Sequence, residues 1–320
     1  MSNNKKGSKI KNFAVENTML IFAVVLFVLC LAGVPRFATG GNILNIMIQV
    51  SINALIACGM TFVILSDGID LSVGSVAAIA GIVGTLWIKL YPDANIGVSL
   101  GIIFVTAIAI GSLCGIVNGF SIAKLNVPPF IATLAMMNIA RGIAYVITDA
   151  KPVFGLPESF GWLGLGQLGP IPIVIILMII IIIISHVVLS KTCFGRYIYA
   201  VGSNKDVAGL TGINVTKIRF SVYIISGILS ALAGLVLASK LQNGQATSGL
   251  GYELNAIAAV AMGGTSMSGG RGGIPQTIVG LVVIGIINNA LSLLGVSSYW
   301  QTVAMGVIIL IAVVIDQYRK

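Results

Sequence analysis

The sequence predicts an all-α, polytopic membrane protein, because apolar residues dominate it, charged residues are rare, and long charge-free stretches recur along it. Of the 320 residues, 57% are hydrophobic and 8% are charged. The mean hydropathy is +1.06. So few polar groups cannot cover the surface of a water-soluble domain of this length. The composition therefore excludes a soluble globular fold.

Stretches without Asp, Glu, Lys or Arg predict the membrane helices in order. A helix needs roughly 17 to 25 residues to cross the hydrocarbon core. Stretches that reach this length are 17–35, 37–66, 71–88, 94–123, 159–190, 220–239 and 272–315. The last is long enough for two crossings, separated at LGVSSYW. With 128–148, which contains Arg141, and a short stretch at 254–268, the sequence predicts about ten crossings.

The placement of Lys and Arg predicts the orientation, because these residues gather in short cytoplasmic loops. With the N-terminus inside and ten alternating crossings, the inner side receives Lys5, Lys6, Lys9, Lys11, Lys124, Lys191, Arg196, Lys205, Lys217, Arg219, Arg271, Arg319 and Lys320. The outer side receives only Arg36, Lys89, Lys151 and Lys240. We therefore expect both termini in the cytoplasm, a basic tail at 1–16 and one transmembrane domain at 17–320. The net charge of +9 follows from this topology, so no nucleic-acid partner is expected.

Two segments rich in Gly and Ser interrupt the apolar pattern, at 66–74 and at 262–274. The second reads MGGTSMSGGRGGI, and the 22-residue stretches that begin at Asn53 and Asn255 align without gaps with six identities. Paired, Gly-interrupted spans are typical of a transporter's pathway, since irregular backbone is tolerated at membrane depth only beside protein or water. The alternative is a Gly-lined turn on the inner side. A phosphate-binding loop is not predicted, because the G-K-[ST] ending is missing.

Polar and charged side chains in or near the spans, together with the glycine break, are the candidates for the pathway or its gate. They are Asn53, Asp67, Asp70, Ser72, Asn118, Arg141, Glu253, Asn255, Gly263, Gly264, Thr265, Ser266 and Asn288. Asp70 has an alternative role as the N-cap of the next span, and Arg141 can instead extend to the membrane interface. The amides can instead hydrogen-bond neighbouring helices. No residues have catalytic or metal-ligand spacing, so neither a catalytic residue nor a metal site is expected.

The longest and most basic cytoplasmic segment is predicted at 191–219. Within it, SNKDVAGLTGI predicts a short helix, since Ser203 or Asn204 can cap its start and Asp206 suits its first turn. Gly209 or Gly212 can end it. Such a helix on the cytoplasmic surface is either a docking site for another protein or a plain connector.

Five blocks of the sequence resemble the membrane permeases of sugar-importing ABC transporters. They are GMTFVILSDGIDLSVGS, PPFIATLAMMNIARGIAYV, GRYIYAVGSNKDVAGLTGI, GYELNAIAAVAMGGTSMSGGRGGI and LLGVSSYWQ. The similarity runs in order from about Asn42 to Asp316. It implies a multi-pass protein of the bacterial cytoplasmic (inner) membrane that imports a monosaccharide such as ribose or a related pentose or hexose. It also implies a dimer of permeases, a cytosolic ATPase pair that holds ATP and Mg, and a secreted sugar-binding protein.

The resemblance places the ATPase-coupling loop of the family on Asn204, Lys205, Asp206, Val207, Ala208, Gly209 and Gly212. The family pattern is E-A-A and, after three further residues, Gly. Asp206, Val207 and Ala208 stand for E-A-A here, and Val207 departs from the pattern. The helix is therefore a firmer expectation than any role for its side chains.

Two other classes of function are compatible with a polytopic membrane protein. A passive channel or facilitator for small polar solutes would need the same polar spans but no docking loop, so ATP-dependent uptake distinguishes it. A membrane enzyme would need a catalytic constellation, and SDGID offers only two carboxylates. The chain contains no Walker A sequence, so we expect it to hold no cofactor and to take its energy from a partner subunit.

Overall fold

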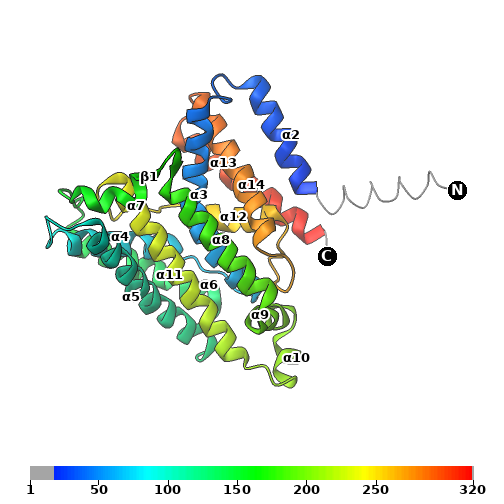
Figure 1. Cartoon of the computed structure of the whole chain (residues 1–320). Helices are drawn as coiled ribbons and strands as arrows, with labels where there is room; N and C mark the ends of the chain where they lie inside the picture. The colour runs from blue at the N-terminus through cyan, green and yellow to red at the C-terminus, as the bar shows by residue number, and fades with distance from the viewer. Residues whose placement is uncertain (1–17, 319–320) are drawn as a thin grey trace.

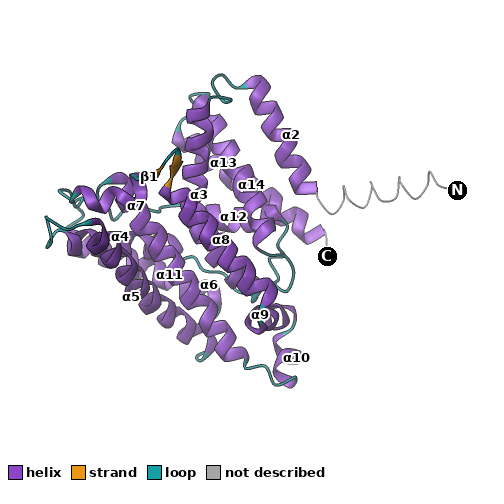
Figure 2. Ribbon diagram, in the orientation of Figure 1, coloured by secondary structure: helices purple, strands orange, loops and turns teal. Residues whose placement is uncertain are grey.

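The computed structural model describes residues 18–318, which are 76% helical with almost no sheet (Figures 1 and 2). The predicted basic tail at 1–16 lies outside the described residues. The longer helices are α2 (Thr18–Gly33), α3 (Gly40–Leu65), α4 (Val73–Ile88), α5 (Ile96–Ala123), α6 (Pro129–Thr148), α8 (Ile173–Lys191), α9 (Cys193–Ser203), α11 (Val215–Leu241), α12 (Tyr252–Gly263), α13 (Ile274–Leu293) and α14 (Ser298–Tyr318). The short elements are the 3-10 helix η1 (Glu158–Gly161), α7 (Trp162–Leu165), β1 (Gln167–Leu168), β2 (Ile171–Pro172) and α10 (Lys205–Leu210).

Six helices among the described residues are long and apolar enough to cross a membrane: α3, α5, α6, α8, α11 and α13. The apolar helices α2 and α4 have 16 residues each, and α12 has 12. Every predicted crossing overlaps a helix of the structure. The total of about ten crossings stays a prediction, because α2, α4 and α12 are shorter than the six long helices and α14 is not among those six.

The charge-free stretch 159–190 contains a long helix only in its second part. The helix α8 begins only at Ile173, and the preceding residues form η1, α7 and a two-stranded hairpin in which Gln167 pairs with Pro172. Gly and Pro recur through this part of the sequence, and both residue types interrupt a helix. The segment 158–172 is therefore a small folded cap.

The centre of the bundle is formed by α3 and α11. In their most apolar windows, 83% of the residues of α3 and 72% of those of α11 are buried, against 22% for α6 and 28% for α8. Figure 1 shows α11 beside α5, with the ribbon of α8 on its other side. The apolar side chains that α6 and α8 leave exposed suit contact with lipid.

Close packing of α5 on α11 explains the GxxxGxxxG spacing of Gly111, Gly115 and Gly119. A Cβ built on Gly111 would lie 2.5 Å from the Cα of Ile228, and one on Gly115 would lie 2.6 Å from the Cα of Ile224. The partner numbers fall as the glycine numbers rise, so the two helices are antiparallel. Small residues at four-residue spacing permit such backbone contact in a membrane bundle, where dispersion replaces the hydrophobic effect as the driving force.

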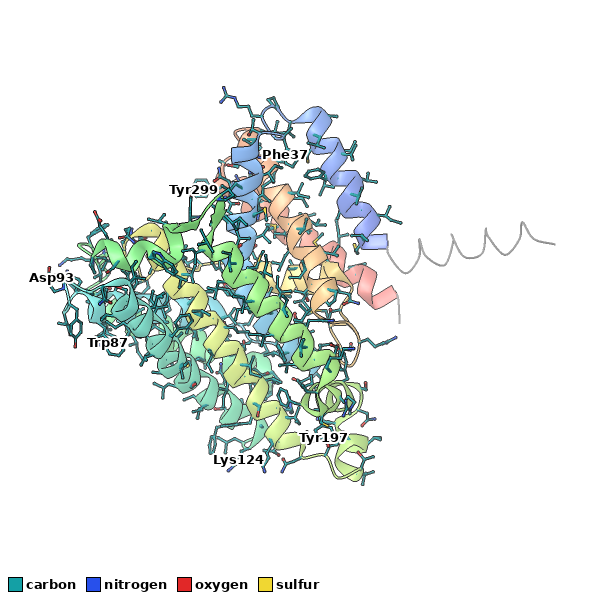
Figure 3. The ribbon with its side chains drawn as sticks, in the orientation of Figure 1. Phe37, Trp87, Asp93, Lys124, Tyr197 and Tyr299 are labelled. Atoms are coloured by element: carbon teal, nitrogen blue, oxygen red, sulfur yellow. The ribbon has the colours of Figure 1, made fainter. Side chains whose placement is uncertain are left out.

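The two ends of the bundle carry different elements. Figure 3 shows Trp87 and Asp93 at the end occupied by α4 and α7, and Lys124 and Tyr197 at the end occupied by α9 and α10. Helix α5 runs from the first end to the second, because it begins just after Asp93 and ends just before Lys124. The segments predicted to lie outside and those predicted to lie inside thus separate to opposite ends.

Candidate translocation pathway and coupling surface

A polar pocket of about 520 Å³ lies between α3, α11, α12, α13 and α14. We call it the amide pocket. Its polar lining residues are Gln49, Asn53, Lys240, Tyr252, Asn255, Asn288, Ser298, Gln301 and Thr302. The volume is in the range of roughly 300 to 1,000 Å³ that is typical of small-molecule sites. Amides and hydroxyls at the level of membrane helices can hydrogen-bond a polar solute that lipid would reject.

Three candidates from the sequence, Asn53, Asn255 and Asn288, come from three different helices and meet in the amide pocket. The Asn53 Nδ2 donates to the carbonyl oxygen of Gln49 at 3.2 Å. Its Oδ1 is buried and has no hydrogen-bond partner among the described residues. A buried acceptor without a partner is costly, so this oxygen is available to accept a hydrogen bond from water or from a solute hydroxyl.

Other polar groups of the amide pocket were not candidates from the sequence. Gln49 lies one helical turn before Asn53, so the spacing alone placed it on the same face. Gln301 and Thr302 lie near the start of α14, and Lys240 lies in the last turn of α11. No local pattern marks these residues, because only tertiary packing brings the helix ends together.

Asp70, Ser72 and Asn118 form a buried hydrogen-bond network with Ser226. The Asp70 carboxylate accepts from the backbone N–H of Ser72 at 3.0 Å, from the Ser72 hydroxyl at 2.6 Å and from the Ser226 hydroxyl at 2.8 Å. Asn118 Nδ2 donates to the Ser72 hydroxyl at 3.0 Å. None of the four side chains is more than 2% exposed.

This network ties the segment after α3 to α5 and α11. The N-cap of α4 is Ser72, and Asp70 binds the turn just before it. Donors surround both carboxylate oxygens, which offsets the desolvation of a buried acid. The structure thus gives these three candidates a positioning role inside the bundle and does not place them in the lining of the amide pocket.

Arg141 and Glu253 hold the segment between α11 and α12. The Arg141 Nη1 donates to the carbonyl oxygens of Ala246 and Ser248, the latter at 2.7 Å. Glu253 Oε1 accepts from the backbone N–H of Gly251 at 3.3 Å, and its charge interacts with that of Arg141. Arg141 therefore binds backbone carbonyls of its own chain, in place of the expected alternative of extending to the interface.

The two interrupted segments contact each other. The backbone N–H of Gly270 donates to the carbonyl oxygen of Leu65 at 3.1 Å. A Cβ built on Gly269 would lie 3.0 Å from the backbone N of Asp67 and 2.8 Å from the carbonyl oxygen of Gly202. These five residues make a contact between the end of α3, the turn before α13 and the end of α9, which we call the break junction.

The remaining candidates of the second interruption form the turn itself. Gly263 ends α12, and Gly264 follows it with φ 95°, a left-handed conformation that favours glycine. Thr265 is fully buried and accepts from the backbone N–H of Gly273 at 3.2 Å, and Ser266 N–H donates to Arg271 O at 2.9 Å. This turn rests on α9, since the Tyr199 hydroxyl donates to the Gly272 carbonyl at 2.8 Å.

Asp67 lies at the break junction with its side chain toward basic residues. Partial desolvation raises the pKa of its carboxyl above the ordinary value, and the positive charges of Arg219 and Lys205 act in the opposite direction. Lys205 is the first residue of α10. The electrostatic field of the basic segment 191–219 therefore reaches the first interruption.

The segment 191–219 is mostly helical, so it is more ordered than the loop with one short helix that the sequence predicted. Its first part is α9, with Ile198 and Val201 buried on one face, and α11 already begins at Val215. The predicted short helix is α10, and the expected cap is confirmed: the Asn204 side chain accepts from the N–H groups of Asp206 and Val207, both at 3.0 Å.

Helix α10 presents apolar side chains to the surrounding space. Leu210 is 89% exposed and Val207 is 54% exposed, three residues apart on one face, while Ala208 is 3% exposed and holds the helix against the bundle. Gly212 follows with φ 85°. The two exposed apolar side chains make this face of α10 a candidate docking surface.

Comparison with known proteins identifies the family. The family described as "Branched-chain amino acid transport system / permease component" matches residues 42–313. The chain is 42% identical to a ribose import permease protein of Haemophilus influenzae, over 99% of this chain and 98% of that one. It is 46% identical to the Bacillus subtilis protein of the same name, over 94% and 91% of the two chains. No solved structure matches.

The chain belongs to this permease family. An L-arabinose transport system permease protein of Escherichia coli is also similar, with 41% identity over 94% of this chain and 90% of that one. The resemblance to ABC-importer permeases drawn from the sequence is confirmed. The permease is a multi-pass membrane protein, consistent with its six long apolar helices.

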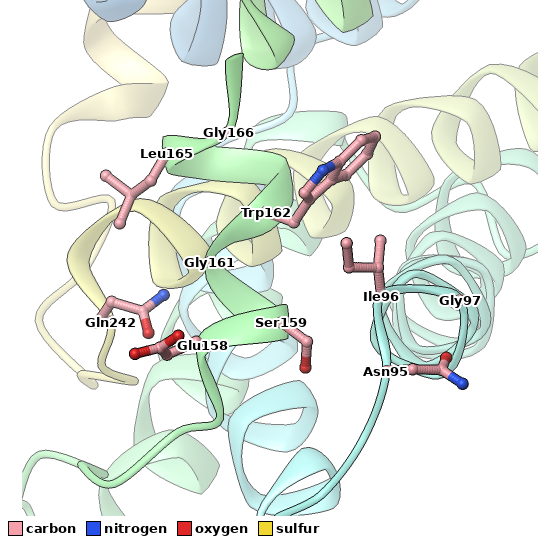
Figure 4. Close-up of a pocket in the computed structure, with 10 residues that line it drawn as sticks. All are labelled: Asn95, Ile96, Gly97, Glu158, Ser159, Gly161, Trp162, Leu165, Gly166 and Gln242. Atoms are coloured by element: carbon pink, nitrogen blue, oxygen red, sulfur yellow. The ribbon is translucent and has the colours of Figure 1, made fainter. Parts of the chain in front are cut away.

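A larger and more open hollow of the permease lies beside the cap, at the end of the bundle opposite α10 (Figure 4). It measures about 920 Å³ and lies between the start of α5 and the η1–α7 segment, with Trp162 on its wall. Asn95 Oδ1 accepts from the N–H of Val98 and so caps α5 there. The wall of this hollow is shallow and mainly apolar, so it offers few hydrogen-bonding groups to a polar solute. The amide pocket is therefore the better candidate for the pathway.

Proposed function

We propose that this permease is the membrane subunit of an ABC importer for a monosaccharide, ribose or a related pentose or hexose. Full-length relatives that carry the names of ribose and L-arabinose permeases support a sugar over the branched-chain amino acid in the family description. The amide pocket supports it as well, since its amides and hydroxyls can both donate to and accept from sugar hydroxyls.

The docking face of α10 is where the cytosolic ATPase binds. The coupling residues are those expected from the sequence, Asn204 to Gly209 and Gly212, with Leu210 and Val207 as the apolar contacts. ATP and Mg are held by that ATPase, and the permease itself catalyses no reaction. A second copy of the permease completes the pathway, and an extracytoplasmic binding protein delivers the sugar.

The contact of α9 with both interrupted segments is the main support for a mechanism in which movement of α10 opens and closes the pathway. Helix α10 follows directly on α9, whose last turn at Gly202 touches Leu65 and Gly270. A displacement of α10 by the ATPase therefore reaches the end of α3 and the turn before α13 through backbone contacts. Such a linkage allows groups of membrane helices to rock against each other about the amide pocket. The pocket then opens to the outside and afterwards to the cytoplasm.

The topology follows the charge distribution. We assign ten crossings, both termini in the cytoplasm, and a location in the bacterial cytoplasmic (inner) membrane. Helices α9 and α10 then lie at the cytoplasmic end, and the cap of η1, α7 and the hairpin lies outside. The separation of these elements to opposite ends of the bundle supports the assignment (Figure 1).

The substrate is tested with the complete transporter in liposomes. The ATPase rate is measured while binding protein loaded with ribose, arabinose, xylose or galactose is added, and leucine serves as the comparison for the family description. We expect one pentose or hexose to stimulate the ATPase and to enter the liposomes. Stimulation by leucine alone would contradict the proposal.

A further inference from the structure

Among the described residues, Lys240 is the only charged side chain that lines the amide pocket. It lies half-buried in the last turn of α11, near Asn53, Tyr252 and Asn288. The only ion pair among residues 18–318 joins Lys151 to Asp149, so the Lys240 ammonium has no carboxylate within salt-bridge distance in this part of the chain. A positive charge thus stands in the pocket without a counter-charge.

The nearest acid in the sequence does not compensate this charge. Glu253 lies between Tyr252 and Leu254, which both line the amide pocket. Its carboxylate is turned toward α4, however, because its Oε2 would lie 2.5 Å from a Cβ on Gly74. There it interacts with the charge of Arg141. The field inside the amide pocket is therefore positive.

A polar pathway for a neutral sugar can also conduct ions. Amide and hydroxyl oxygens that replace the water around a sugar also replace the water around a cation, as they do in cation pores. A polar route that opens across the membrane therefore conducts ions unless an electrostatic barrier opposes them. A single fixed positive charge raises the energy of a cation nearby and leaves an uncharged sugar almost unaffected.

We infer that Lys240 makes the amide pocket selective for uncharged solutes by excluding cations during transport. This inference rests on the proposed function of the permease, because it concerns the pathway that a sugar would take. The ammonium also donates up to three hydrogen bonds, so it contributes to binding of the sugar hydroxyls while it repels ions. The sugar therefore crosses the membrane without a leak of cations through the same pathway.

A simpler role for Lys240 would be to stabilise the C-terminal end of α11 through the helix dipole. Lys89 is a matched control for this role, since it caps the C-terminal end of α4, is exposed, and lies outside the lining of the amide pocket. If the dipole were the whole role, neutralising either lysine would change stability slightly and leave ion permeability unchanged.

The test measures two fluxes in liposomes that contain the complete transporter with ATP and ribose-loaded binding protein. Ribose uptake reports the proposed function, and Rb⁺ efflux during turnover reports the barrier. We expect Lys240→Gln to raise Rb⁺ efflux at least about tenfold and Lys240→Glu to raise it further, whereas Lys240→Arg and Lys89→Gln match the wild type. Lys240→Met replaces Lys240→Gln if the latter does not reach the membrane.

Rb⁺ efflux at the wild-type level in Lys240→Gln and Lys240→Glu, with ribose still imported, would overturn the inference and leave the proposed function standing. Absence of uptake of ribose, arabinose, xylose and galactose alike by the wild type, each supplied on its binding protein, would contradict the proposed function instead. An equal rise in Lys89→Gln would also count against the inference, because it would show that the effect does not depend on the amide pocket.

Discussion

Replacing Leu210 by alanine isolates the apolar contact that α10 offers to the ATPase. The side chain is 89% exposed, so its loss costs the free permease little stability. If docking buries the leucine, Leu210→Ala removes three buried carbon atoms at about 0.8 kcal/mol each, or about 2.4 kcal/mol. At about 1.4 kcal/mol for each factor of ten, the dissociation constant of the ATPase should rise roughly 50-fold.

The assay titrates purified ATPase onto the permease in detergent or nanodiscs and measures the fraction bound. Leu168→Ala is the matched control, because Leu168 is 70% exposed but lies in the cap at the opposite end of the bundle. We expect wild-type binding for the control and unchanged membrane yield for both variants. An unchanged ATPase affinity in Leu210→Ala would refute the docking face on α10.

Three further substitutions test the packing, the break junction and the buried network. Gly115→Leu should lower the yield of folded permease sharply because the backbone of α11 leaves no room for a Cβ, while Gly101→Leu on the same helix meets open space and should fold normally, as judged by size-exclusion chromatography. Gly270→Ala should reduce ribose uptake by about tenfold or more relative to Gly295→Ala. Both glycines have φ above 70°, but only at Gly270 would the added Cβ clash with Ser203 of α9. Asp70→Ala should destabilise the permease by about 1 to 3 kcal/mol in thermal unfolding, because it leaves the buried hydroxyls of Ser72 and Ser226 without their acceptor; an unchanged melting temperature would rule out the network as a structural tie.

Features that depend on local sequence could be predicted. The cap at Asn204 and the interruptions at 66–74 and 262–274 follow from residue types that act within a few positions along the chain. The gapless alignment from Asn53 and Asn255 also places the starts of α4 and α13 within one residue of each other, since Val73 aligns with Pro275. The charge-free stretches located the long helices because this signal, too, is read from neighbouring residues along the chain.

Features that depend on tertiary packing could not be predicted. Asn53 and Asn288 were candidates because amides are rare in apolar spans, but nothing in the sequence showed that Lys240 and Gln301 would join them. Asp70 looked like a possible pathway group, yet Ser72 and Ser226 from two separate segments donate to its carboxylate, and Asn118 from a third donates to Ser72. Helix α9 did have a signal, the buried pair Ile198 and Val201 at helical spacing, within a segment that its charges marked as a loop.

Accumulation of ribose against a gradient tests the central claim most directly. Liposomes carrying the permease, its ATPase and the ribose-binding protein are supplied with ATP on the ATPase side, and labelled ribose is followed on both sides of the membrane. We predict uptake beyond the external concentration that stops when ATP or the binding protein is left out. Uptake that proceeds without ATP and ends at equal concentrations would show a passive facilitator and contradict the account.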